Sequence, residues 1–293
     1  MTLKRPFIFV RLAGGLGNQL FQFSASIKLA QRLCLPHSNI IIDTRALGSY
    51  ETKRKYEIGF ISNLYPGLHV PAQLPFLESY ASRVRLAVLD RRIGPFELIS
   101  SVEHLSKVLA NGLRASSYVL DGYFQHPNIV FSDVDRKYVF TMLTSSKHYL
   151  IDKFLGNQRS MAIHIRRGDY ITSKFAKMLF RSIPIEYYDA AYKTLWSGQK
   201  VFVFSDDSEL SSYYASKIGG IDVRKLNLSL EDEFCLLMTC DDKIIANSTF
   251  SWWAAYLGGR SNKRVVCPKR WYKNNKLNSS NSLLLPFFKV IDI

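Results

Sequence analysis

The beginning of the chain constrains the fold most, because an apolar strand, a glycine-rich turn, a helix and a second apolar strand follow one another within residues 7–43. We predict a buried strand over Phe7–Leu12, a helix over Asn18–Leu33 and a strand over Asn39–Asp43. Strands connected through a helix run parallel. The segment therefore predicts an α/β domain with a parallel sheet, to which Tyr118–Gly122 adds a strand. The buried face of the helix is expected to carry Leu20, Phe23, Ile27 and Ala30.

A second series of strands and helices begins near residue 161. The polar stretch Gly156–Ser160 separates it from the first series. We therefore predict two α/β domains facing a cleft, over residues 1–157 and 158–293. The strands expected in the second domain are Met161–Ile165, Val201–Ser205, Lys243–Ala246 and Arg264–Cys267, and the helices are Ile185–Trp196, Leu230–Cys240 and Phe250–Leu257.

The net charge favours an anionic partner. The chain has 39 basic and 24 acidic residues, a net charge of +15. Such a surplus attracts nucleic acid, anionic lipid or a nucleotide sugar, although a basic protein can also lack any charge-specific role. The basic residues form short, separate clusters, whereas an arginine-rich nucleic-acid arm would be concentrated. If the protein is not an enzyme, the alternative is a basic RNA-binding module.

The four cysteines predict neither a metal site nor a disulfide framework. They show no CxxC spacing and no His-rich neighbourhood, so reduced thiols of a cytoplasmic protein are expected. The apolar run Phe7–Leu12 is too short for a signal peptide or a membrane-spanning helix. We expect no helical anchor.

The turn Gly14–Gln19 joins the first strand to the first helix. Leu20 occupies the third glycine position of GxGxxG, so the turn fails as a dinucleotide fingerprint. Its glycines still allow a ligand to approach the backbone amides, and Asn18 and Gln19 add amide donors at the helix N-terminus. The alternative is a tight structural turn.

Polar side chains follow three strands of the second series. They lie in His164–Tyr170, in Ser205–Asp207 and in Asn247–Phe250. The carboxyl ends of parallel strands meet at one edge of a sheet, where ligands bind in α/β proteins. An arginine at this edge suits a diphosphate, because its planar group forms paired, charge-assisted hydrogen bonds.

The sequence assigns roles to only some of the residues in these motifs. One of the two arginines, Arg167 by preference, is expected to be structural and paired with an acid. Asp206 or Asp207 could accept hydrogen bonds from guanine or ribose, or cap the following helix, and each could take one role. Small hydroxyl residues at 248–249 open a helix whose N-terminus suits a phosphate, and an aromatic ring at 250 or beyond could cover the base or sugar.

Taken together and in this order, the motifs Gly-Gly-Leu-Gly-Asn-Gln, His-x-Arg-Arg-Gly-Asp-Tyr, Phe-Ser-Asp-Asp and Asn-Ser-Thr-Phe-Ser-Trp-Trp resemble those of the bacterial and animal α1,2-fucosyltransferases of glycosyltransferase family 11. Gly122–Gln125 and Ile185–Ala190 are also similar to family segments, so the resemblance spans almost the whole chain. Asp242 departs from it, since many relatives carry histidine there. The donor site is expected to tolerate this change.

The resemblance implies a GT-B-like fold of two Rossmann-like domains, with GDP-fucose on the C-terminal domain and the acceptor facing the N-terminal one. It implies inverting transfer of L-fucose to the 2-hydroxyl of a β-galactoside, without a metal or another cofactor. The acceptor would be a galactose-terminated glycan of bacterial O-antigen or surface polysaccharide, lipid-linked at the cytoplasmic leaflet. Transfer to another linkage is the alternative.

The resemblance also implies roles for particular residues. Arg166 would bind the diphosphate with Ser248 and Thr249, His164 and one of the two aspartates would lie near guanine or ribose, and Asn18 would lie near the diphosphate–fucose junction. Asp43 and Asp169, both at strand ends, are the two candidates for the general base. The complete donor-binding set is Gly15, Gly17, His164, Arg166, Arg167, Asp206, Asp207, Asn247, Ser248, Thr249 and Phe250.

Two further segments carry alternatives. Asp133-Val-Asp135 fits the DxD motif of metal-dependent enzymes, but Arg136–Lys137 would crowd a cation and the segment reads better as a solvated helix start. Leu77–Ile93 mixes apolar residues with four arginines and could lie on anionic lipid if it is helical. Its alternative is an ordinary core-facing helix with a solvated basic side.

Overall fold

The structure is a computed structural model that describes residues 6–48, 53–68, 70, 96–111, 117–168, 170, 173–258, 264–279 and 283–292. By its internal contacts the chain divides into two compact units, Met1–Asp135 and Arg136–Ile293. Two predictions, the base candidate Asp169 and the Leu77–Ile93 helix, lie outside the described residues. No helix in the described part of the chain is both long and apolar enough to cross a bilayer.

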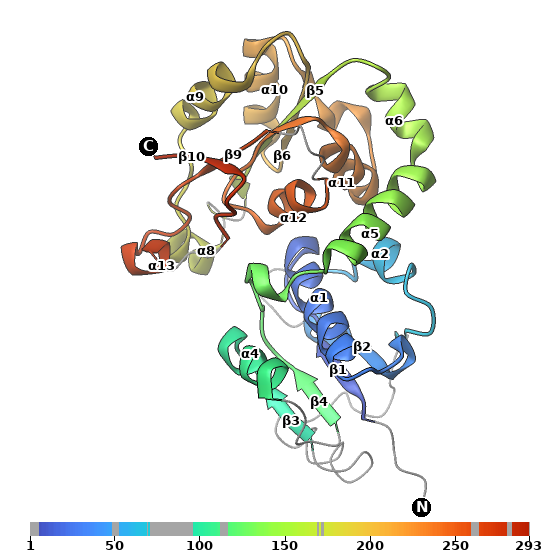
Figure 1. The fold of residues 1–293 in the computed structure, drawn as a ribbon. Coiled ribbons are helices and arrows are strands. Elements are labelled where there is room, and N and C mark those ends of the chain that lie inside the picture. Colours follow the sequence, from blue (N-terminus) through green and yellow to red (C-terminus); the bar gives the residue numbers. More distant parts are fainter. Residues whose placement is uncertain are drawn as a thin grey trace, which may run out of the picture. The chain divides into compact units, whose positions relative to one another are not determined.

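The first unit contains a four-stranded parallel sheet in the order β2-β1-β4-β3 (Figure 1). The predicted strand–helix–strand unit is confirmed, with β1 and β2 aligned so that Ile8 lies opposite Ile40. The four residues predicted for the buried face of α1 are all buried. The elements are β1 Ile8–Arg11, α1 Leu16–Arg32, η1 His37–Asn39, β2 Ile40–Asp43, η2 Arg45–Gly48, α2 Gly59–Ser62, β3 Phe96–Ile99, α4 Val102–Asn111, β4 Ser117–Leu120 and η3 Pro127–Ile129.

The second unit contains a six-stranded parallel sheet in the order β10-β9-β8-β5-β6-β7. All four strands predicted for this region are present, and β7 and β10 extend the sheet at its two sides. The strands are β5 Ser160–Ile165, β6 Lys200–Ser205, β7 Ile221–Asp222, β8 Asp242–Ile244, β9 Val265–Pro268 and β10 Phe288–Ile291. The helices are α6 His148–Phe154, α8 Lys174–Leu179, α9 Ile185–Leu195, α10 Ser208–Ile218, η4 Val223–Leu226, α11 Leu230–Thr239, α12 Thr249–Leu257 and α13 Asn275–Ser279.

The division between the two units falls after Asp135, earlier than the predicted boundary after residue 157. It lies within helix α5, Asp133–Ser146. The contacts of the segment that follows α5 explain this position. Lys147 forms ion pairs of 3.0 Å with Glu231 and with Asp232 at the start of α11. At the end of α6, Lys200 Nζ donates to the Phe154 carbonyl at 2.8 Å. Residues 147–154 are therefore tied to the second sheet.

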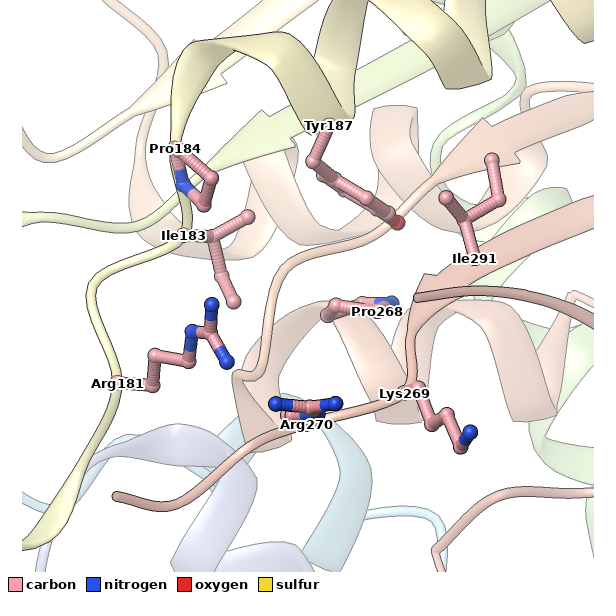
Figure 2. Close-up of a pocket in the computed structure, with 8 residues that line it drawn as sticks. All are labelled: Arg181, Ile183, Pro184, Tyr187, Pro268, Lys269, Arg270 and Ile291. Carbon is pink, nitrogen blue, oxygen red and sulfur yellow. The ribbon is translucent and has the colours of Figure 1, made fainter. Parts of the chain in front are cut away.

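A shallow surface pocket lies at the carboxyl ends of β9 and β10 (Figure 2). It is an open depression of the surface and not an enclosed cavity. The residues that line it come from β9 and β10, the start of α9 and the chain after α8; they are Arg181, Ile183, Pro184, Tyr187, Pro268, Lys269, Arg270 and Ile291.

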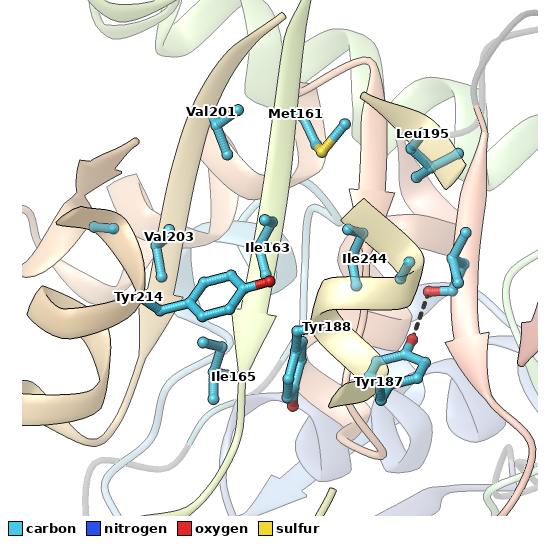
Figure 3. Packing of buried hydrophobic residues seen from close by; sticks show 13 residues of the cluster. Met161, Ile163, Ile165, Tyr187, Tyr188, Leu195, Val201, Val203, Tyr214 and Ile244 are labelled. Carbon is cyan, nitrogen blue, oxygen red and sulfur yellow. Dashed lines mark hydrogen bonds between the residues drawn. The ribbon is translucent and has the colours of Figure 1, made fainter. Parts of the chain in front are cut away.

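The core of the second unit forms where α9 and α10 pack against the sheet (Figure 3). All six residues of β5 are buried, as expected for a central parallel strand covered on both faces. Tyr187 of α9 donates through its hydroxyl to the carbonyls of Ile245 and Val266, at 2.8 and 3.1 Å. These bonds fix α9 on the sheet near the carboxyl ends of β8 and β9.

Each sheet has a point at which the strand order reverses. In the first sheet the chain leaves β1 toward β2, and β4 pairs with the other side of β1. In the second sheet the chain leaves β5 toward β6, and β8 pairs with the other side of β5. Ligands of open α/β sheets bind beyond the carboxyl ends of the strands at such points. The fold therefore places one candidate site after β1 and β4, and another after β5 and β8.

Candidate functional site

An ion pair across two neighbouring strands organises the carboxyl edge of the second sheet. Arg166 follows β5 and Asp206 follows β6; the Arg166 Nη1 to Asp206 Oδ2 distance is 2.8 Å. The backbone N–H of Arg167 donates to Asp206 Oδ1 at 2.8 Å, and the Gly168 N–H adds a further bond. A Cβ at Gly168 would lie 2.7 Å from Asp206 Oδ2, which explains the glycine. The acid therefore pairs with Arg166 and not, as expected, with Arg167, whose side chain is exposed.

The electrostatics of this pair keep both members charged. Burial alone would raise the pKa of Asp206, but Arg166 and the amides of Arg167 and Gly168 lower it below its usual range. The Arg166 guanidinium also lies 5.8 Å from the Tyr170 ring centroid. Its side chain keeps 22% exposure. Arg166 is therefore a positioned cation with access to the sheet edge.

His164 is a buried, neutral imidazole beside this pair. Its exposed fraction is 5%, and burial together with the adjacent Arg166 charge lowers its pKa to about 4, against the opposing effect of Asp206. Among the described residues Nδ1 has no hydrogen-bond partner. A buried polar atom of this kind calls for a partner. His164 can thus offer a ligand a neutral hydrogen-bonding group.

Helix α12 starts at the same edge, directly after β8. Ser248 is its N-cap residue, and the Ser248 side chain forms no capping bond. The first turn contains no acid, and the first helical bond runs from Trp252 N to the Ser248 carbonyl. A helix N-terminus without an acid of its own is a favourable place for an anion. This geometry fits the phosphate role predicted for Ser248 and Thr249.

Phe250 lies in the first turn of α12 between two other rings. Its centroid is 5.6 Å from that of His164 and 5.5 Å from that of Phe234 on α11. Phe250 is therefore held beside the imidazole, as a residue that covers a base or sugar would be. The two tryptophans that follow, Trp252 and Trp253, are fully buried and belong to the core.

Two residues predicted for donor binding also form structural bonds. Asn247 Nδ2 donates to the carbonyls of Arg181 and Trp271, at 2.8 and 2.9 Å, so both amide hydrogens are used within the fold. Asp207 caps α10 by accepting from Leu210 N at 3.0 Å. Of the two roles considered for these aspartates, the helix cap belongs to Asp207, while Asp206 contacts the segment that follows β5.

At the first sheet, the glycine-rich turn is built by its own polar side chains. Gly14 has φ +76°, a conformation that favours glycine. Gln19 is fully buried; its Nε2 donates to the carbonyls of Gly14 and Lys55, and its Oε1 accepts from Glu57 N. Gln19 therefore holds the turn and is not the outward donor that we predicted. Asn18 Oδ1 accepts from Gln125 Nε2 at 2.9 Å.

Gln125 follows β4, so its bond to Asn18 spans the carboxyl ends of β1 and β4. The two family-like segments of this unit therefore meet at the first sheet's reversal point. Arg11 and Asp121 form an ion pair of 2.8 Å between the ends of the same two strands. Nothing in the sequence pattern singled out this pair.

Asp43, a base candidate, is held in a local ion pair. Arg45 Nε and Nη2 donate to its two carboxylate oxygens, each at 2.7 Å, and Arg45 N adds a bond of 3.0 Å. Burial raises the pKa of Asp43, but these bonds to Arg45 outweigh it and lower the pKa below its usual range. A base role for Asp43 would require Arg45 to move aside.

Sequence reasoning missed Glu233 and Glu57. Burial raises the pKa of Glu233, although Arg224 opposes this, and Arg224 Nη1 in turn contacts the Ser205 carbonyl at the end of β6 at 3.3 Å. Glu233 belongs to a run of three acids in the first turn of α11, where acidic residues are common, so the sequence did not single it out. Glu57 Oε2 lies 3.6 Å from the Cβ position of Gly15, over the turn, in a region whose sequence showed no regular pattern.

The DxD-like pair forms a helix start, as predicted. Asp133 is the first residue of α5, and Ser132 Oγ accepts from Asp135 N at 3.1 Å. Gln31 Nε2 donates to Asp135 Oδ2. Within the described ranges, no group of three or more His, Cys, Asp or Glu side chains is arranged to hold a metal ion.

Asp242 lies at the amino end of β8, opposite the candidate site. It is fully buried and pairs with Arg264 Nη2 at 2.7 Å, with additional bonds from Gln199 and Arg159. The Asp242 charge is thus neutralised within a local network. This network lies at the end of β8 opposite to that from which the chain runs to α12.

Comparisons with known proteins agree with this architecture. The family described as Glycosyl transferase family 11 matches residues 103–287. The O-antigen biosynthesis glycosyltransferase WbnK of Escherichia coli is 27% identical over 297 residues, covering 90% of this chain and 94% of that protein. The alpha-1,2-colitosyltransferase of Escherichia coli is 24% identical over 285 residues, covering 93% and 94%.

Among solved structures, the fucosyltransferase NodZ from Bradyrhizobium has a TM-score of 0.51 at 16% identity, with 86% of this chain and 93% of that chain covered. NodZ alpha-1,6-fucosyltransferase soaked with GDP-fucose has a TM-score of 0.50 at 16% identity, with 87% and 93% covered. These likenesses concern the fold, and with the two parallel sheets they confirm the GT-B-like α/β prediction. The chain belongs to glycosyltransferase family 11.

Proposed function

We propose that this protein transfers L-fucose from GDP-fucose to the 2-hydroxyl of a β-galactoside in a bacterial O-antigen or related surface polysaccharide. Family membership supports a fucosyltransferase-type enzyme. The name of the first relative, an O-antigen biosynthesis glycosyltransferase, supports the O-antigen setting, and that of the second, an alpha-1,2-colitosyltransferase, supports an α1,2 linkage. NodZ crystals with GDP and with GDP-fucose support a guanosine-diphosphate sugar as donor.

The observation that carries the proposal is the Arg166–Asp206 pair at the carboxyl ends of β5 and β6, next to the β5/β8 reversal point at which α12 starts without an acid. A diphosphate bound there would meet a guanidinium from one side and helix amides from the other. The neutral His164 and the Phe250 ring lie next to this position and can contact the base or ribose. Within the second unit these groups converge on one edge.

The proposed reaction is a direct displacement. The acceptor oxygen attacks the anomeric carbon of fucose, the bond from that carbon to the β-phosphate oxygen breaks, and the electron pair stays on GDP. The hydroxyl proton passes to a base, for which Asp169 is one candidate. Inversion follows from attack opposite the leaving group. Each donor aimed at the developing phosphate charge is worth about 2.7–4 kcal/mol, so Arg166 and α12 can stabilise the leaving group without a metal.

A second candidate keeps the reaction but changes the donor sugar. One relative is named as a colitosyltransferase, and it is nearly as similar to this chain as the O-antigen enzyme. Colitose transfer is therefore the specific alternative to fucose transfer.

The test is an incubation with GDP-fucose and a panel of β-galactosides in EDTA, followed by product analysis by mass spectrometry and NMR. We expect an α-linked fucose on O2 of galactose, formed without added metal. Fucosylation at another hydroxyl would correct the linkage, and transfer only from a colitose donor would favour the second candidate. Activity lost in EDTA and restored by Mn²⁺ would refute the metal-independent mechanism.

A further inference from the structure

One face of the second unit is basic and contains no acid of its own. Residues 173–183 carry Lys174, Lys177 and Arg181 without an acid, and residues 268–279 carry four more cations, also without an acid. We call these two segments together the α8–α13 face. The cations of the second segment are Lys269, Arg270, Lys273 and Lys276, all of which are exposed.

Backbone bonds hold the two segments side by side. Lys273 N donates to the Leu179 carbonyl at 3.0 Å, and Arg181 N donates to the Trp271 carbonyl at 3.1 Å. Phe180 and Tyr272 form an antiparallel bridge, and their rings stack at 5.5 Å. In Figure 1, α8 and α13 accordingly lie next to each other. The seven cations are therefore carried by two adjoining segments.

Few acids reach this surface. Asp292 pairs with Lys269 at 2.9 Å and with Arg270 at 3.1 Å. Glu186, in the first turn of the nearby α9, interacts with Lys217 of α10. No described acid forms an ion pair with Arg181, and Figure 2 shows Arg181 and Arg270 reaching toward the same part of the pocket.

The rim of the shallow pocket presents groups that bind phosphate. It combines Arg181, Lys269 and Arg270 with the start of α9, an 11-residue helix whose N-cap residue Pro184 makes no side-chain capping bond. Helix amides and guanidinium groups are both phosphate ligands. The pocket lies on the β9–β10 side of the sheet, away from the reversal point between β5 and β8.

Apolar side chains also protrude from this surface. Met178 of α8 is 72% exposed, and Leu277 of α13 is 39% exposed. Exposed apolar groups surrounded by lysine and arginine are typical of surfaces that rest on anionic membranes, where cations meet headgroups and apolar side chains enter the interface. A soluble phosphate would not require Met178.

We infer that the α8–α13 face docks on an anionic membrane, with the phosphate of one lipid headgroup against Arg181 and Arg270 at the rim of the pocket. The chain's net charge of +15 favours the same partner. This surface differs from the Leu77–Ile93 segment singled out in the sequence, and its docking does not depend on which sugar is transferred. Asn247 ties the face to the donor edge, because its amide holds the carbonyls of Arg181 and Trp271.

The test is flotation of the full chain with vesicles of phosphatidylglycerol in phosphatidylcholine, compared with pure phosphatidylcholine. The variant Lys174→Gln/Lys177→Gln/Lys273→Gln removes three cations from the face. The matched control Lys153→Gln/Lys193→Gln/Lys225→Gln removes three exposed lysines from α6, α9 and η4. We expect the first variant to bind about a hundred-fold more weakly than wild type, since each cation near such a surface contributes about five-fold, and the control to lose far less.

Two single variants sharpen the assignment. Arg181→Gln should lose more binding than Lys174→Gln, because only Arg181 lines the pocket. Met178→Ser should weaken the binding that persists at high salt. Transfer to a water-soluble galactoside should stay at the wild-type rate in all of these variants, which separates this test from that of the proposed function.

Three results would overturn the inference. Wild-type protein that stays with the soluble fraction at low salt shows no docking. Equal losses in the two triple variants show that net charge alone, and not this face, drives binding. Binding of RNA or inorganic phosphate through these residues, without binding of vesicles, shows that the occupant is not a membrane.

Discussion

The two sheets of this protein carry polar motifs at equivalent topological positions, yet the motifs are used differently. After β1, the side-chain amide of Gln19 donates to the Gly14 and Lys55 carbonyls and accepts from Glu57 N. After β5, the side chain of Arg166 pairs with Asp206 and remains partly exposed at the edge. The polar side chain of the first motif holds the conformation of the glycine-rich turn. In the second motif the ion pair holds the charged guanidinium of Arg166 in position. Strand-end position alone does not distinguish these two uses.

The same contrast appears between the two strand-end aspartates. Asp43 pairs with Arg45, only two residues away, in a local clamp. Asp206 pairs with Arg166 from the neighbouring strand, so its bond joins two parts of the candidate site. A local pair stabilises its own turn, while a pair between strands positions a group for a ligand. The predictions below test this difference.

The largest expected effect is on catalysis at the second sheet. Arg166→Ala should lower kcat by about 10²–10³, because the main counter-charge to the leaving group is lost. Arg166→Lys should also be poor, since an ammonium group cannot make paired hydrogen bonds. Steady-state kinetics with saturating donor measures the effect, and circular dichroism checks that the variant is folded. More than a tenth of the wild-type activity in Arg166→Ala would exclude the assigned role.

His164 should make the second unit sensitive to acid. Its pKa is lowered to about 4 in the folded state by burial and by Arg166, so below the unfolded value of about 6.5 the unfolded chain binds the proton first. Stability should therefore fall as the pH drops from about 6.5 to about 4, by up to about 3 kcal/mol. Urea unfolding of wild type and His164→Gln across this range measures it. An equally steep decline in the variant would contradict the prediction.

At the first sheet, the expected effect is on stability. Gln19→Ala removes three part-buried hydrogen bonds, to the Gly14 and Lys55 carbonyls and from Glu57 N, and should cost about 2–3 kcal/mol of unfolding free energy. Asn18→Ala removes one half-buried bond, to Gln125, and should cost about 1 kcal/mol. Thermal and urea unfolding of the two variants measure the difference. If Gln19→Ala instead kept full stability and lost donor affinity, the turn would be a ligand site after all.

The smallest effect is expected at a helix cap. Asp207→Ala should destabilise α10 by about 1 kcal/mol and leave transfer unchanged, because the side chain caps the helix. Asp206→Ala, one residue earlier, should reduce transfer because Arg166 loses its partner. Comparing kcat/KM and unfolding midpoints in the two variants separates the roles. An equal loss of activity in Asp207→Ala and Asp206→Ala would contradict the separate roles assigned to the two residues.

The sequence by itself determined the two parallel α/β series and the strand ends at which the polar motifs lie. Apolar runs such as residues 161–165 and 201–204, bounded by polar groups, are a local signal, and the buried strands β5 and β6 follow from them. The helix start at Asp133 was also readable, because capping depends on neighbouring residues.

Only the tertiary structure decided which polar atoms remain available. Whether Arg166 or Arg167 pairs with the acid depends on β6 lying beside β5, and whether Asn247 can bind a ligand depends on the Arg181 and Trp271 carbonyls approaching it. Glu57 comes to lie over Gly15 from a segment 42 positions away in the chain. Hydrogen bonds between distant segments leave no periodic trace in a sequence, and for this reason the roles of single side chains emerged only from the folded chain.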